Sequence, residues 1–325
     1  SDKGDYDAAI SSYRKALELK PDDAGAYCYM GVAQSNKDDY DAAISSFLKA
    51  LELKPDFAEA YCNMGFAQSD KGDYDAAISS SRKALELKPD LAEAYRSMGY
   101  VLTDKGDYDA ALESYQKALE LNPNYVEAYN DMGYIFNKKG DYEGAIASCQ
   151  KALQLKSDYA NPCVHIGVAQ KNIGDYDCAL ASFQKALEIK PTYLSAKVNL
   201  SDLYLITERF NQSLELLHQL LKEKDVRQHQ SLAMKSIAIS SLFFQGNKAE
   251  ALMELQQLIT YYRDLTNDFK RDWDYCSIKK FITHTQRLNE PTRLLLLKMI
   301  DLLEAPKKEG DKILVELEIM VREFK

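Results

Sequence analysis

The stretch Ala58–Leu91, AEAYCNMGFAQSDKGDYDAAISSSRKALELKPDL, decides the fold. Its first half carries apolar or small side chains at helical spacing, at Ala60, Tyr61, Met64, Gly65 and Ala67. A turn follows at Lys71-Gly72-Asp73, where glycine permits a backbone conformation that other residues avoid. The second half repeats the helical spacing at Ala77, Ile78, Ser81, Ala84 and Leu85. Pro89 ends it, so the stretch predicts two helices joined by a tight turn.

The pattern recurs with a period of 34 residues. The segment DYDAAISS begins at Asp5, Asp39 and Asp73, and close variants begin at Asp107, Asp141 and Asp175. A fixed period of this length is typical of repeat architectures, in which each unit buries its apolar face against its neighbours. The low glycine content, 14 residues, and the abundance of good helix formers favour helices throughout.

The order of aromatic, Gly, Gly-Asp-Tyr, Ala and Pro over 34 residues resembles the tetratricopeptide repeat family. Half a unit occupies residues 1–23, and full units occupy 24–57, 58–91, 92–125, 126–159 and 160–193. The resemblance implies an all-α fold, a right-handed α-solenoid of antiparallel helix pairs. It also implies that Tyr27, Tyr61, Tyr95 and Tyr129 and the tyrosines of the Asp-Tyr-Asp segments are core residues.

Two departures from the pattern carry structural predictions. Asp38 stands where the turn glycine belongs, and aspartate tolerates left-handed backbone better than most residues do. Asn161-Pro162 fits a helix cap followed by proline at the first helical position.

We predict three domains. Residues 1–193 form the repeat array, 194–265 form degenerate repeat-like helix pairs, and 266–325 form a C-terminal helical cap. In the last segment we expect helices at 273–288, 291–304 and 311–324. Terminal repeats must cover an exposed apolar face, which favours a cap, and a separate binding module is the alternative.

The net charge of the chain indicates which kinds of partner are disfavoured. Residues 1–193 carry 21 basic and 31 acidic side chains, and 194–325 carry 20 and 19, which together give the net charge of −9. This acidity disfavours a nucleic-acid partner, because phosphate contacts need a basic stripe. No apolar run reaches the length of about 18 residues that a membrane span needs, so we expect no membrane partner.

The six cysteines are Cys28, Cys62, Cys149, Cys163, Cys178 and Cys276. Their spacing matches neither a metal site nor a disulfide framework, and free thiols favour a cytoplasmic location. The sequence contains no phosphate-binding loop, dinucleotide fingerprint, zinc-protease motif or nucleophile elbow. We therefore predict that the chain is not an enzyme and needs no metal or cofactor.

The resemblance also implies a binding surface. In this family the first helices line a concave groove, and ligand contacts come mainly from the second, fifth, sixth, ninth, twelfth and thirteenth positions of each unit. The candidate peptide-binding residues read from three of these positions are Tyr29, Val32, Asn63, Phe66, Arg96, Tyr100, Asn130, Tyr134, His165 and Val168. Two alternatives stay open: the ninth-position row packs between repeats, and His165 is an ordinary surface residue.

The predicted function is a protein–protein interaction adaptor or scaffold that binds a peptide segment or a protein face in this groove. One alternative is a targeting or regulatory arm of a larger protein whose active domain lies outside the chain. Another is a self-assembling structural array. Because residues 1–23 make only half a unit, we expect that end to fray or to self-associate.

Overall fold

The computed structural model describes residues 2–220, 228–264, 279, 282–283, 285, 288–304 and 307–323. Within these ranges the regular elements are 17 α-helices packed in sequential pairs, with no strand. The predicted all-α tetratricopeptide solenoid is therefore confirmed. The chain divides into two compact units, Ser1–Ser157 and Asp158–Lys325, which are described separately.

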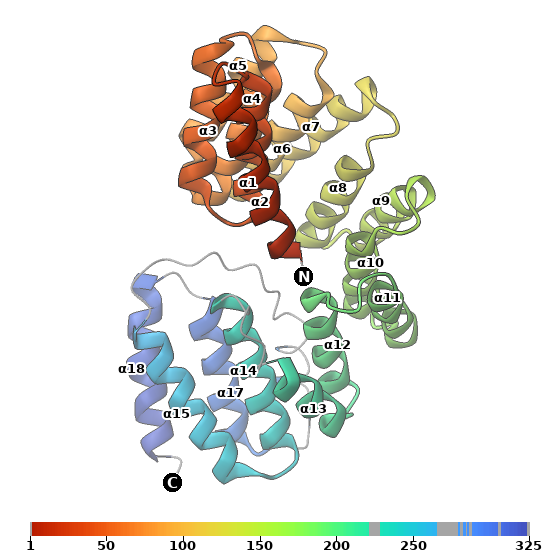
Figure 1. Ribbon diagram of the computed structural model, residues 1–325. Helices are drawn as coiled ribbons and strands as arrows, with labels where there is room; N and C mark the ends of the chain where they lie inside the picture. The colour runs from red at the N-terminus through yellow and green to blue at the C-terminus, as the bar shows by residue number, and fades with distance from the viewer. Residues whose placement is uncertain are drawn as a thin grey trace. The chain divides into compact units, whose positions relative to one another are not determined.

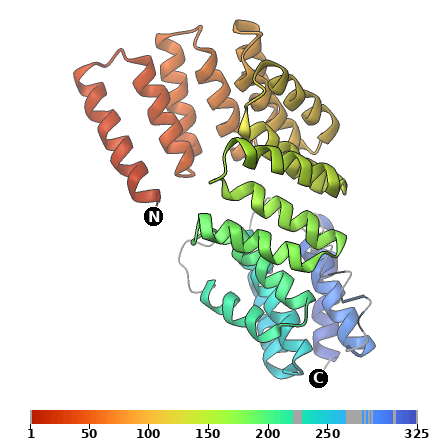
Figure 2. The ribbon, with the colours of Figure 1, turned by 90° about the vertical axis from the view of Figure 1, so that its right-hand side faces the viewer.

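The first unit begins with a single helix that is followed by four helix pairs (Figure 1). Its helices are α1 (Asp2–Leu19), α2 (Ala24–Asn36), α3 (Tyr40–Leu53), α4 (Ala58–Lys71), α5 (Tyr74–Leu87), α6 (Ala92–Lys105), α7 (Tyr108–Leu121), α8 (Val126–Lys139) and α9 (Tyr142–Leu155). Neighbours in the chain are neighbours in space, as the helices from red to brown show (Figure 2). Each first helix also contacts the first helix of the next pair, which makes a continuous surface of α2, α4, α6 and α8.

The second unit continues the pairs and then departs from them. Its helices are α10 (Ala160–Ile173), α11 (Tyr176–Ile189), α12 (Leu194–Ile206), α13 (Phe210–Leu220), α14 (Gln228–Phe244), α15 (Lys248–Asp264), α17 (Glu290–Glu304) and α18 (Lys307–Glu323). The last two agree with the helices expected at 291–304 and 311–324, although α18 begins four residues earlier. The helix expected at 273–288 lies largely outside the described residues, and so does Cys276.

The turns follow the sequence closely. Gly72 ends α4 with φ of 91°, and the N–H of Asp73 donates to the carbonyl of Gln68, which closes the helix end. Asp38 takes the same left-handed region with φ of 66°, as predicted. The prediction for Asn161-Pro162 is wrong, because α10 already begins at Ala160 after Tyr159. Pro162 is tolerated because it lies in the first turn, where a backbone N–H has no helical partner.

A small residue lets the two helices of a pair approach closely. The ring of Tyr115 on α7 lies over Gly99 on α6, where an added Cβ atom would meet its Cε1 at 2.8 Å. Phe47 covers Gly31 and Phe183 covers Gly167 in the same way. Where the second helix carries Ser81 instead of a ring, the space holds a hydroxyl pair, 2.9 Å between the Oγ atoms of Ser81 and Ser97.

Among the residues that the structure describes, the fully buried aromatic side chains are these second-helix rings, Phe47, Tyr115 and Phe183. The tyrosines expected in the core are instead half-buried, and Tyr176 is 41% exposed. Tyr27 and Tyr61 pack against the buried cluster around Phe47. The prediction that these tyrosines are core residues overstated their burial. The small residue of the first helix faces the second helix, and the space it leaves is filled by the ring of the second helix.

Two of the kinds of ion pair in the described residues connect neighbouring repeats and differ in burial. At the turn edge of the first unit a lysine ending one first helix pairs with an aspartate at the start of the preceding second helix. These pairs are Lys37–Asp7, Lys71–Asp41, Lys105–Asp75 and Lys139–Asp109. In the second unit Lys171 of α10 pairs with Asp202 of α12, and their side chains are 1% and 0% exposed.

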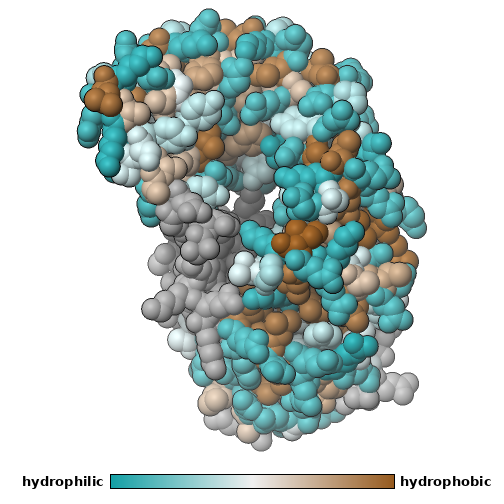
Figure 3. Space-filling model, turned by 45° about the vertical axis from the view of Figure 1, so that its right-hand side comes forward, coloured by the Kyte–Doolittle hydropathy of each residue, from teal (hydrophilic) through white to brown (hydrophobic). Residues whose placement is uncertain are grey.

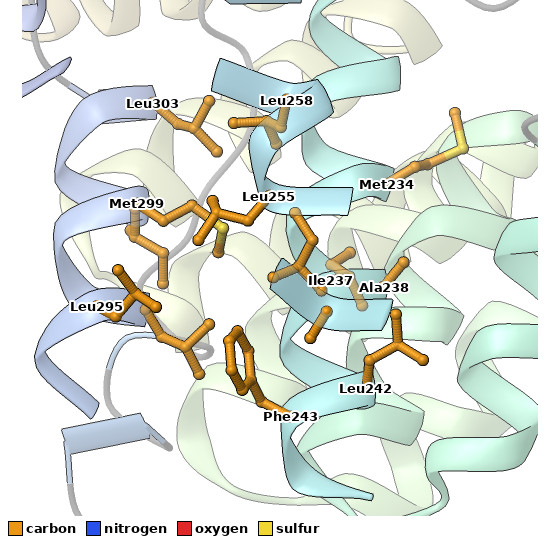
Figure 4. Close-up of a cluster of buried hydrophobic side chains, with 14 of the residues drawn as sticks. Met234, Ile237, Ala238, Leu242, Phe243, Leu255, Leu258, Leu295, Met299 and Leu303 are labelled. Atoms are coloured by element: carbon orange, nitrogen blue, oxygen red, sulfur yellow. The ribbon is translucent and has the colours of Figure 1, made fainter. Parts of the chain in front are cut away.

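The core of the second unit joins the repeat-like helices to the last two. Ile237 and Phe243 of α14 lie on the side of Leu255 of α15 and of a leucine-rich side of α17, and Met234 belongs to the same buried cluster (Figure 4). Leu295, Met299 and Leu303 supply that side of α17. Burial of such side chains supplies about 1.5–3 kcal/mol each, so α17 covers an apolar surface that α14 and α15 would otherwise expose.

Removal of a buried tyrosine ring of a second helix should cost more stability than removal of a half-buried ring of a first helix. We expect Tyr115→Ala to lower the free energy of unfolding by about 3–5 kcal/mol, because it empties a buried site over Gly99. Tyr95→Ala removes a half-buried ring, and we expect less than about 2 kcal/mol. Thermal and urea melts measure both, and equal losses would contradict the placement of the core.

Removal of the buried ion pair should likewise cost more stability than removal of an exposed pair at the turn edge. Lys171→Met leaves Asp202 buried without its cation, and we expect a loss of about 3–5 kcal/mol. The matched Lys105→Met removes a pair whose aspartate is 95% exposed, and we expect less than about 1 kcal/mol. Urea melts of the two variants compare them, and a mild Lys171 variant would show that the pair is not buried in solution.

Candidate peptide-binding groove

The candidate surface is formed by α4, α6 and α8, whose first residues are Ala58, Ala92 and Val126. We use the name groove face for the side chains at the second, fifth, sixth, ninth, twelfth and thirteenth positions of these three helices. The visible surface of the molecule is largely hydrophilic, with scattered hydrophobic residues (Figure 3). The groove face is of interest because it combines rings with charges.

The centre of the groove face is an aromatic pair. The rings of Phe66 on α4 and Tyr100 on α6 meet edge to face with centroids 5.3 Å apart, and both side chains are half-buried. The guanidinium of Arg96, one turn before Tyr100, lies 5.1 Å from the centroid of the Phe66 ring. Rings with accessible faces and a stacked arginine are the residue types that most often anchor protein partners.

Arg96 is held by a carboxylate from the next helix. Its Nε donates to Oδ2 of Asp131 on α8 at 2.8 Å, and Nδ2 of Asn130 donates to the other carboxylate oxygen at 3.2 Å. Burial raises the pKa of the Asp131 carboxyl, and Arg96 opposes that rise. Positioned donors and rings of this kind present a preformed surface, which reduces the entropy cost of binding.

Two further carboxylates accept hydrogen bonds from hydroxyl groups, and both bonds join α4 to α6. The hydroxyl of Tyr100 donates to Oδ1 of Asp70 at 2.7 Å, and Ser69 Oγ donates to Oδ2 of Asp104 at 2.8 Å. Burial, followed by the charges of Asp70 and Asp104, raises the pKa of Tyr100 well above its usual range, so the donor stays protonated.

The structure brings only some of the predicted residues together. Phe66, Arg96, Tyr100 and Asn130 form one connected group with Asp131. Asn63 donates to the Cys28 sulfur at 3.8 Å. This links α4 to α2.

The other predicted residues have different surroundings. Tyr29 is 63% exposed and stacks on Tyr13 of α1, with centroids 6.1 Å apart. Val32 and Tyr134 pack against buried clusters, while Lys138 lies 5.3 Å from the Tyr134 centroid. His165 and Val168 are half-buried on α10 in the second unit.

The sequence reading missed the carboxylates of the groove face. Glu59, Glu93 and Glu127 occupy the second position, and Asp70 and Asp104 occupy the thirteenth. The signal was available, because these residues recur 34 apart at positions where the family places ligand contacts. The prediction used only the fifth, sixth and ninth positions, so it did not include the carboxylates at the second and thirteenth positions.

Metal-ligating side chains, cysteines and helix hydropathy in the described part of the chain also bear on function. No three metal-ligating side chains come together among those residues. The described cysteines Cys28, Cys62, Cys149, Cys163 and Cys178 form no disulfide with one another. Burial raises the pKa of Cys28 and Cys62, which keeps both protonated. Among the helices that are described, none is long and apolar enough to cross a membrane.

Family models match along most of the repeat region. A model described as TPR repeat matches residues 2–38, 36–72 and 99–140. Models described as tetratricopeptide repeat match residues 58–91, 126–159 and 173–235. The chain therefore belongs to the tetratricopeptide repeat family. A comparison with curated protein sequences gave no match.

Human IFIT1 and TTC0263 are solved structures that share the fold. Human IFIT1, solved as a dimer with m7Gppp-AAAA, is 19% identical with a TM-score of 0.65, over 92% of this chain and 72% of that one. TTC0263 of Thermus thermophilus is 24% identical with a TM-score of 0.52, over 56% and 100%. YrrB, described as a TPR protein with an unusual peptide-binding site, is 26% identical with a TM-score of 0.39, over 57% and 96%.

Two glutamates of the second position should respond oppositely to pH. Burial raises the pKa of Glu93, and Arg96 only partly offsets this while Glu59 adds to it. The ionised form therefore destabilises the fold as pH rises through the raised pKa. We expect Glu93→Gln to melt higher than the parent at pH 7 and equally below the ordinary pKa of 4.5.

Glu59 is the control for that measurement. Burial acts to raise its pKa, but the ion pair with Lys88 outweighs burial and lowers it. Its stabilising contribution is present above 4.5 and lost as pH falls through the lowered pKa. We expect Glu59→Gln to melt slightly lower than the parent at pH 7, and the same sign in both variants would contradict the assigned environments.

Proposed function

We propose that the chain is an adaptor that binds a peptide segment of a partner protein on the groove face. Tetratricopeptide repeat proteins commonly mediate protein and peptide binding. The observation that carries the proposal is the edge-to-face pair of Phe66 and Tyr100 with Arg96 over the Phe66 ring. This group spans two neighbouring first helices and is only partly buried, although the fold already offers fully buried positions for rings at Phe47 and Tyr115.

The repeats form a scaffold that is typically non-catalytic, and no catalytic domain is identified. A cytoplasmic location and the absence of a nucleic-acid partner stay predictions. The acidic groove face supports the second of these for this surface, because it repels phosphate. The targeting-arm and self-assembly alternatives also stay predictions.

The test separates binding from folding. Random peptides displayed on phage are selected on the whole chain, and the enriched peptides are titrated against variants. We expect Phe66→Ala and Tyr100→Ala each to weaken binding by about 2 kcal/mol, because anchors in a preformed surface carry most of the affinity. Fluorescence anisotropy measures the affinities, and thermal melts verify that the variants fold.

Leu48→Ala is the matched control. Leu48 is a 50% exposed apolar side chain on the second helix α3, outside the groove face. We expect the control to bind as the parent does. If the two ring variants keep full affinity while folded, the binding surface lies elsewhere and the proposal is wrong.

A further inference from the structure

We propose that the occupant of the groove face is a cationic segment, an extended stretch of a partner protein with lysine or arginine at about every third residue. This inference rests on the proposed function and names the chemistry of the partner. It depends on the charges of the groove face, on how those charges are partnered, and on the spacing of the helices.

The groove face carries a surplus of negative charge. Its carboxylates are Glu59, Asp70, Glu93, Asp104, Glu127 and Asp131. Its cations are Arg96 and Lys138, and Lys88 pairs with Glu59 from outside the groove face, so six negative and three positive charges leave a net charge of −3. Opposite charges across an interface steer association and suppress wrong partners, so this surface selects a basic ligand over an acidic one.

On the groove face, Glu59 and Asp131 pair with Lys88 and Arg96, while hydroxyl groups donate to two other carboxylates. These two are Asp70 and Asp104, which accept from the hydroxyls of Tyr100 and Ser69. At the turn edge, Asp41, Asp75 and Asp109 each pair with a lysine. Half-buried carboxylates beside rings interact with a cation more strongly than carboxylates in open water do.

A buried acceptor adds an independent observation. Asn130 is 6% exposed, and within the described residues its Oδ1 has no hydrogen-bond donor. Its Nδ2 donates to Asp131, whose other oxygen holds Arg96, so the amide belongs to the groove-face network. A buried acceptor without a donor costs free energy, and a donor from a bound cationic side chain offsets that cost.

The helix spacing sets the spacing of the basic residues. Neighbouring packed helices lie about 8–10 Å apart, and an extended chain advances about 3.3 Å per residue. Every third residue of the ligand therefore meets the next first helix. The two aromatic rings lie between the carboxylate rows, where they contact the lysine stems and the intervening apolar residues.

The test uses a fluorescein-labelled synthetic peptide of repeated Lys-Thr-Val and a matched peptide of repeated Glu-Thr-Val. We expect the lysine peptide to bind the whole chain and the glutamate peptide not to bind. The double variant Glu93→Gln/Asp104→Asn should weaken binding of the lysine peptide by about tenfold or more, because it removes two charge-assisted contacts. Phe66→Ala should weaken the same peptide.

The control variant is Asp75→Asn/Asp109→Asn, which changes the net charge equally but alters only the turn edge. We expect this control to weaken binding less than about twofold, since exposed paired charges contribute little. Equal loss in both double variants would show general attraction to an acidic protein and overturn the inference. Absence of lysine-peptide binding would overturn it too, and so would a single-stranded RNA oligonucleotide that binds in a Phe66-dependent manner.

The inference and the proposed function fail differently. If phage-selected peptides require Phe66 and Tyr100 but carry no excess of lysine or arginine, the groove binds peptides and the charge inference is wrong. If neither selected nor synthetic peptides respond to Phe66→Ala, the proposed groove itself is wrong.

Discussion

The close approach of the two helices in each pair is the constraint on which the rest of the structure depends. A glycine on the first helix leaves room for one side chain of the second helix, and at Gly31, Gly99 and Gly167 that side chain is a full aromatic ring. A Cβ atom at these glycines would meet the ring at less than 3 Å, so the residue type and the interhelical distance are coupled. Repetition of this contact every 34 residues makes one helix pair resemble the next.

The same contact determines which rings are left for binding. Ninth-position side chains such as Phe66 and Tyr100 directly follow the glycine of the close contact, so they point about 100° around the first helix from it. There they pair with one another and with Arg96, and form part of the contact between neighbouring units. Packing between repeats and exposure to a ligand are therefore two aspects of one half-buried row. Stability and binding have to be measured on the same variants for this reason.

Electrostatics differ between the two sides of the first unit. At the turn edge, lysines and aspartates alternate from helix to helix and largely cancel. On the groove face, carboxylates recur at the second and thirteenth positions with few cations among them. The surplus is spread over three helices. In the second unit Lys171 at the twelfth position of α10 pairs with Asp202 at the ninth position of α12. Both side chains are buried, so this pair joins the two helices and is not available to a ligand.

The sequence by itself determined the helix pairs, their turns and the family, because these depend on local periodicity and on turn residues such as Gly72 and Asp38. It also pointed to Phe66, Arg96 and Tyr100, because equal positions of a repeat share a face. Only the tertiary structure decided that Tyr95 is half-buried while Tyr115 is buried, and that Arg96 bonds Asp131. Burial and pairing of these residues depend on neighbours 16 to 35 positions away, on other helices. Their distances are set by packing, which no local pattern encodes.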